Sequence, residues 1–230
     1  MNSIQTFRFT GIRRENGNST FPLAQKISDA LDFDKRLFFV LLVFIFLVIR
    51  YLTNTIVLEA IPDSERLEAQ GDLLFFHIFN TLNYLWTPFA LLWKFTVIAF
   101  LFWSIGLTIG YKVKFKALWQ FALVAELIFI FPELLRLLWY MNPTGTVSYL
   151  EIQNFEPLSA LWVLGPENVQ EKYHYPLSLL NLFEIGYGIV WVLGFHTISR
   201  RSIQESIPVV LLSYFLPLFL WLAFYAASYR

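Results

Sequence analysis

Five apolar stretches, each a little over twenty residues long, decide what this chain can fold into. They cover residues 37–58, 88–110, 117–140, 177–197 and 207–228. An α-helix needs about 20 mainly apolar residues to cross the hydrocarbon core of a bilayer. Because lipid offers no hydrogen bonds, a spanning segment must satisfy its own backbone groups, and a helix does so by itself. The sequence therefore predicts an all-α integral membrane protein with a bundle of five transmembrane helices.

The composition supports this class. Of the 230 residues, 57% are hydrophobic and 15% are charged, and the mean hydropathy is +0.56. A soluble domain has about 45–50% apolar and about 25% charged residues. The formal net charge is zero, so there is no overall electrostatic attraction to nucleic acid. We therefore expect the lipid bilayer to be a partner of this chain, and nucleic acid not to be one.

Two further segments have the character of short interfacial helices. The apolar segment 73–86 has only fourteen residues, and its polar members His77, Asn80 and Asn83 recur every third position. One polar stripe on a short apolar helix is typical of a helix that lies in the membrane interface. The second candidate, 22–33, also has apolar residues at helical spacing. It belongs to a polar N-terminal tail, residues 1–36.

The basic residues predict how the chain is threaded. Lys and Arg accumulate in cytoplasmic loops. With five spans, eleven of them fall on the side of the N-terminal tail and three on the other side. Counting 73–86 as a sixth span would place the basic cluster 112–116 outside. We therefore expect residues 37–230 to form one five-span membrane domain with a cytoplasmic N-terminus, an outer C-terminus and one sizeable outer loop, 141–176.

Charged residues inside the predicted spans are the candidate functional groups. They are Arg50, Lys94, Glu126, Glu133, Arg136 and Glu184. Such residues are costly in a membrane and usually face a partner or a functional path. Glu133 and Arg136 lie three apart on one helix and can pair directly. Arg50 and Glu126 lie at similar depths in their predicted spans, so we expect these two residues to pair.

Depth likewise predicts an ion pair between Lys94 and Glu184. Asn181 lies three residues before Glu184 on the same helical face, so the two can share a partner. This polar network has two interpretations: structural ion pairs that fix helix association, or a proton or ion path through the bundle. Pro132 is expected to kink the third span just before Glu133. The glycines 186, 188 and 194 are expected to let neighbouring helices approach the fourth span closely.

No catalytic, cofactor-binding or metal-binding set is apparent in the sequence. The chain has no cysteine, and its three histidines are far apart and outside any zinc-ligand spacing. No nucleophile and base occur in a recognisable arrangement. We therefore expect a non-enzymatic protein without a cofactor.

Two stretches of the chain resemble a known family. One is "PLSLLNLFEIGYGIVWVLGF", which is followed by a basic loop and an apolar span. The other is "LFWSIGLTIGYKVKFKALWQFALVAELIFIFPELL", in which a glycine-ended span is followed by a short basic segment and the opening of the next helix. Both are similar to the Yip domain family, membrane proteins named for their interaction with Ypt/Rab GTPases, and the first stretch is similar to the last two spans of that family. Together the resemblance covers about residues 37–228.

The resemblance implies five spans with a cytosolic N-terminus, and action through an unknown protein partner or through membrane organisation and trafficking. The short tail and the Phe-, Ile- and Asn-rich composition suggest a bacterial member in the inner membrane. A homo-oligomer is a further expectation. The alternative from the residues is a small ion- or proton-coupled transporter or channel that uses the intramembrane charges.

Overall fold

The structure is a computed structural model that describes residues 34–59, 74–141 and 155–229. These residues form helices and no strand. The possible helix at 22–33 and much of the predicted outer loop, 142–154, lie outside the described residues.

Long helical segments make up most of the described chain. They are α2 (Lys35–Glu59), α4 (Leu74–Thr108), the series α5 (Phe115–Ala125), η1 (Glu126–Phe129) and α6 (Ile130–Tyr140), then α10 (Leu182–Ser199), and the series α11 (Ile203–Val210), η4 (Leu211–Phe215) and α12 (Leu216–Ser228). Short helices precede α10: α8 (Ala160–Leu164), η2 (Pro166–Asn168), η3 (Glu171–Tyr173) and α9 (His174–Leu179).

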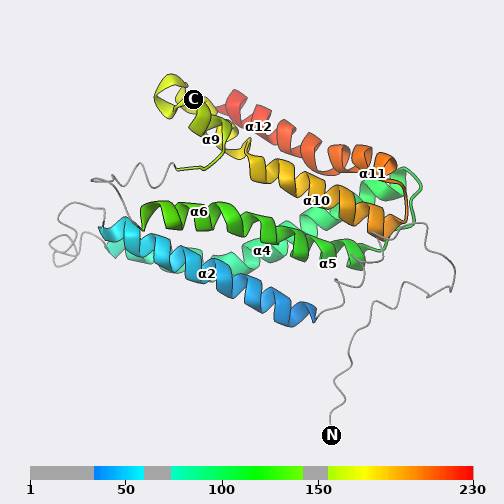
Figure 1. The fold of residues 1–230 in the computed structure, drawn as a ribbon, viewed down its shortest axis with the longest axis horizontal. Coiled ribbons are helices and arrows are strands. Elements are labelled where there is room, and N and C mark those ends of the chain that lie inside the picture. The colour runs from blue at the N-terminus through cyan, green and yellow to red at the C-terminus, as the bar shows by residue number, and fades with distance from the viewer. Residues whose placement is uncertain (1–33, 60–73, 142–154, 230) are drawn as a thin grey trace, which may run out of the picture.

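The long segments lie side by side and alternate in direction (Figure 1). Helix α2 packs against α4 and α6, α4 against α5, and α10 against α5 and α11. In the view of Figure 1, the loops between α4 and α5 and between α10 and α11 lie at one end of the bundle. Helices α8 and α9 and the end of α12 lie at the other end. An up-and-down helical bundle is therefore the architecture.

Four helices in the described part of the chain are long and apolar enough to cross a membrane. They fall at Lys35–Ile56, His77–Thr108, Leu182–Ser199 and Ile203–Ser228. The third predicted span, 117–140, is not among them, because a 3₁₀ turn separates α5 from α6. Pro132 explains this turn, since it has no N–H to bond the carbonyl four residues earlier. The predicted kink therefore takes the form of a change of helix type.

The segment 73–86 was expected to form a separate interfacial helix, but it is not separate from the helix that follows it. Residues from Leu74 onward belong to α4, which continues through Pro88 to Thr108. Two hydrogen bonds hold this half of α4 beside α2. Arg50 Nη1 donates to Thr87 Oγ1 at 3.2 Å, and Asn54 Nδ2 donates to Tyr84 OH at 2.6 Å. Tyr84, near the end of this segment, therefore takes part in the contact between α4 and α2.

The last two spans begin at caps. Helix α10 begins at Leu182 rather than 177, because Asn181 accepts a hydrogen bond from the Glu184 N–H and caps the helix. The last helical series begins at Ile203 rather than 207, after a capping box of Ser202 and Glu205. Such caps satisfy N–H groups that have no partner inside the helix.

Aromatic side chains fill the core between α4, α5 and α10. Phe95, Phe102, Trp191 and Phe195 are fully buried. The rings of Phe102 and Trp191 stack with centroids 3.9 Å apart. A Cβ on Gly194 would overlap the ring of Phe121. This glycine therefore permits α10 to pack directly on an aromatic ring of α5.

Candidate functional site

An ion pair between α4 and η1, in which the acid is buried, is the first element of the candidate site. Lys94 Nζ donates to Glu126 Oε1 at 2.7 Å, and Glu126 is 2% exposed. The ammonium of Lys94 also lies 3.9 Å from the ring centroid of Phe129, within the range of a cation–π interaction. The 3₁₀ turn thus supplies both the acid and an aromatic ring around one lysine.

Glu184 forms the second element, at the first turn of α10. Its carboxylate accepts a hydrogen bond from the hydroxyl of Tyr214, in η4, and the residue is 9% exposed. Lys94 and Glu126 are both close enough to interact electrostatically with Glu184. The centroid of the Tyr187 ring lies 4.9 Å from the ring centroid of Phe129 and 4.9 Å from that of Tyr214. We call Lys94, Glu126, Glu184, Tyr187 and Tyr214 the polar cluster.

Both long-range pairings expected from depth are wrong. Lys94 bonds Glu126 rather than Glu184, and Arg50 bonds the hydroxyl of Thr87. Helix α2, which carries Arg50, packs against α4 and α6, whereas η1, which carries Glu126, packs against α10. The side chain of Lys94 reaches Glu126 from α4. Depth along a span gives the height of a residue in the bundle, but not the neighbour that it faces.

Several buried polar atoms around the polar cluster have no hydrogen-bond partner in the structure. They include Glu126 Oε2 and Ser213 Oγ. Buried polar atoms are usually satisfied, so each exception requires an explanation. One of these atoms belongs to the buried acid itself, and the other belongs to the residue next to Tyr214.

Two departures from regular α-helix coincide with the polar cluster. Glu126 lies in the 3₁₀ turn η1, and Tyr214 lies in the π-helical turn η4. Such irregular turns within helices often mark functional sites or hinges. Pro217 gives η4 a local cause, because it cannot donate to the carbonyl of Ser213. The sequence contained these prolines, but the type of turn depends on packing.

Glycines on α10 allow the neighbouring helical segments, including these irregular turns, to come close. A Cβ on Gly188 would lie 2.5 Å from the ring of Phe215, in η4. A Cβ on Gly186 would lie 2.7 Å from Ile128 Cδ1, in η1. The close packing expected of the glycines in this helix is confirmed.

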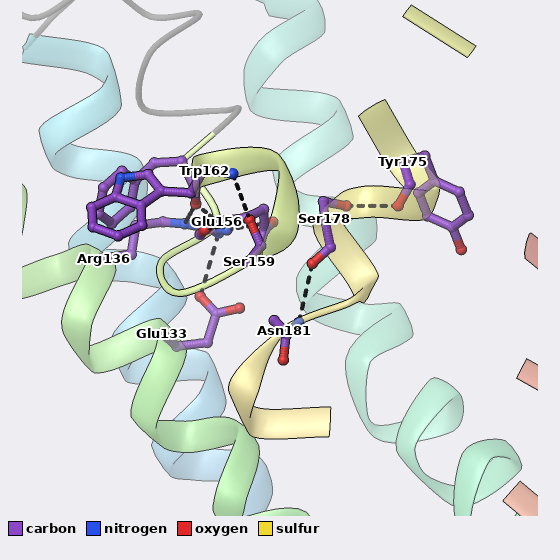
Figure 2. Close-up of polar contacts among 9 residues, drawn as sticks. Glu133, Arg136, Glu156, Ser159, Trp162, Tyr175, Ser178 and Asn181 are labelled. Carbon is purple, nitrogen blue, oxygen red and sulfur yellow. Dashed lines mark hydrogen bonds and ion pairs between the residues drawn. The ribbon is translucent and has the colours of Figure 1, made fainter. Parts of the chain in front are cut away.

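Arg136 organises a second polar group at the end of α6 (Figure 2). It lies 3.5 Å from Glu133, which confirms that predicted pair, and 2.8 Å from Glu156. Its guanidinium also donates twice to the carbonyl of Phe155, at 3.1 and 3.0 Å. Burial raises the pKa of Glu156, while Arg136 opposes the rise. Glu156 lay in the predicted outer loop, where no periodicity indicated its partner.

Asn181 makes hydrogen bonds to two backbone groups between this end of the bundle and the polar cluster. Its amide donates to the Ser178 carbonyl at 3.1 Å (Figure 2), and its oxygen accepts from the N–H of Glu184 at 2.9 Å. Asn181 and Glu184 are therefore close, as expected, because the Asn181 side chain caps the helix through the backbone N–H of Glu184. The two side chains do not share a partner among the contacts described here.

No group of three or more His, Asp or Glu side chains suited to a metal ion occurs in the described part of the chain. His174 Nε2 lies 3.0 Å from the carbonyls of Pro166 and Val169, and His196 Nδ1 contacts the carbonyl of Arg201. These two histidines bind backbone groups. The residues with unusual environments are thus the acids and tyrosines of the polar cluster.

Comparisons with protein-family models, with curated proteins and with solved structures give no match for this chain.

Proposed function

We propose that this protein is a non-enzymatic, five-span membrane protein of the Yip type, which acts through a protein partner or through membrane organisation. One observation carries the proposal: the long segments alternate in direction, so the basic loops 110–114 and 200–202 lie at the same end of the bundle as the start of α2 (Figure 1). Gathering of Lys and Arg at one end is typical of the cytoplasmic side.

The fifth crossing is the series α5, η1 and α6. It is helical from residue 115 to 140. It follows α4 and precedes α10 along the chain, and it runs opposite in direction to both (Figure 1). A stretch of this length is sufficient for a bilayer of about 30 Å. In this proposal the N-terminus is cytoplasmic, the C-terminus is outside, and the membrane is the inner membrane of a bacterium.

A second function, proton- or cation-coupled transport, is favoured by the polar cluster. Two buried acids, Glu126 and Glu184, share the neighbourhood of one base, Lys94. Intramembrane acids without a basic partner of their own commonly belong to proton or ion paths. The sequence predicted one basic partner for each intramembrane acid. Among the described residues of the polar cluster, two acids share one base instead.

Proton flux in liposomes that contain the pure protein separates the two functions. A protein that acts through partners should leave the decay of an imposed pH gradient at the rate of protein-free liposomes. A transporter should accelerate the decay, and Glu126→Gln should abolish the acceleration. Glu167→Gln is the matched control, because Glu167 lies in η2, away from the polar cluster. Flux that Glu126→Gln removes and Glu167→Gln retains would replace the first proposal with the second.

A further inference from the structure

The polar cluster carries more acid than base. Within the described residues it contains Lys94 from α4, Glu126 from η1 and Glu184 from α10, with the phenols of Tyr187 and Tyr214. If both carboxyl groups were ionised, the cluster would carry a net charge of −1. An unbalanced charge away from water is strongly unfavourable.

Three other charged residues on the surrounding helices have partners of their own. Glu133 on α6 pairs with Arg136, and Arg50 on α2 donates to Thr87. Glu205 at the start of α11 bonds Ser202 in the capping box. Among the described residues, Lys94 is the base that acts on both acids of the cluster.

The two acids are not equivalent. Glu126 contacts the ammonium of Lys94 at 2.7 Å, which stabilises its carboxylate. Glu184 contacts a neutral hydroxyl, that of Tyr214. A carboxyl group next to a neutral phenol keeps one oxygen as an acceptor when the other oxygen carries a proton.

We propose that the polar cluster is a proton-binding site, and that Glu184 carries the proton beside the Lys94–Glu126 ion pair. Uptake forms an O–H bond between a proton from water and the Glu184 carboxylate, and release returns that proton to water. With the proton bound, the cluster is neutral. The proposal requires only that the bundle is buried in a membrane or detergent, and it does not depend on transport.

Release of the proton changes the balance around Lys94. Glu184 then becomes a second carboxylate that attracts the same ammonium, so the Lys94–Glu126 pair weakens. Because Glu126 and Tyr214 lie in irregular turns, this change acts on the parts of two helices least fixed by regular hydrogen bonds. The bundle should therefore lose stability as the pH rises through proton release, since the neutral cluster is the favoured one.

Infrared spectroscopy tests the proposal on the full chain in detergent. A protonated carboxyl group has a carbonyl stretch separate from those of carboxylates and amides. The parent protein should show this band, and it should disappear as the pH is raised. Glu184→Gln should remove the band, and Glu133→Gln, which changes an acid already paired with Arg136, should leave it unchanged.

A second variant keeps the test decisive if Glu184→Gln does not fold. Tyr214→Phe removes the hydrogen bond to Glu184 and should shift the frequency of the band without removing it. No protonated carboxyl band in the parent, a band that persists in Glu184→Gln, or a band that Tyr214→Phe does not shift would overturn the assignment. Displacement of the band by Na⁺ at constant pH would show a monovalent-cation site instead. Liposome flux is a separate measurement, so a band without flux supports this site and rejects transport.

Discussion

Replacing Lys94 by leucine is expected to lower the stability of the bundle by about 3–5 kcal/mol, the usual cost of leaving a buried charge without its partner. Glu126 is 2% exposed, and its carboxylate contacts Lys94 at 2.7 Å. Glu126→Leu should cost less, because the Lys94 side chain is 37% exposed and a long side chain can move its ammonium toward a polar boundary. Thermal unfolding of the purified variants in detergent gives the comparison.

The double variant Lys94→Leu/Glu126→Leu should recover most of the loss, since removing both members of a buried pair is often nearly neutral. Arg50→Leu is the matched control, because Arg50 also lies in a predicted span but bonds the Thr87 hydroxyl. Its effect should add to that of Glu126→Leu, as for independent sites. Rescue of Glu126→Leu by Arg50→Leu, and not by Lys94→Leu, would contradict the pairing described here.

Gly194→Ala should destabilise the bundle by about 1–3 kcal/mol, the usual cost of overpacking a core. The new Cβ would overlap the ring of Phe121, which is itself buried. Alanine gains about 0.8–1 kcal/mol of helix propensity over glycine, so the overlap must outweigh that gain. Thermal unfolding in detergent again provides the measurement.

Gly186→Ala is the control on the same helix. Its Cβ would meet the terminal methyl of Ile128 at 2.7 Å, and a flexible side-chain end can shift. This variant should therefore be close to neutral, and Phe121→Leu should relieve Gly194→Ala in the double variant. Equal losses for the two glycine variants, or no relief by Phe121→Leu, would show that the close approach of α10 to α5 is not a packing requirement.

The helical class and most element positions were accessible from the sequence because they depend on local patterns. Apolar length placed α2, α10 and the last helical series, and spacing alone predicted the Glu133–Arg136 pair. The start at Ile203 was also readable, since Ser202 and Glu205 have the spacing of a capping box. Local rules of this kind need no knowledge of the neighbouring helices.

Contacts between helices were not accessible in the same way. Lys94 and Glu126 were both recognised as candidates, but their pairing depends on how α4 and η1 are placed in the bundle and on the reach of the Lys94 side chain. Tyr214 was missed because a tyrosine in an apolar helix gives no signal of its hydrogen-bond partner. The continuity of α4 through Pro88 was missed for a related reason, since contacts with α2 support that half of the helix.

Labelling of single cysteines tests whether α5, η1 and α6 together cross the membrane. The chain has no native cysteine, so Lys114→Cys and Asn154→Cys place one thiol before and one after this segment. In sealed cells, Asn154→Cys should react with a membrane-impermeant reagent and Lys114→Cys only with a permeant one. Reaction of both with the impermeant reagent, or of neither, would place the two positions on one side and contradict the five-span account.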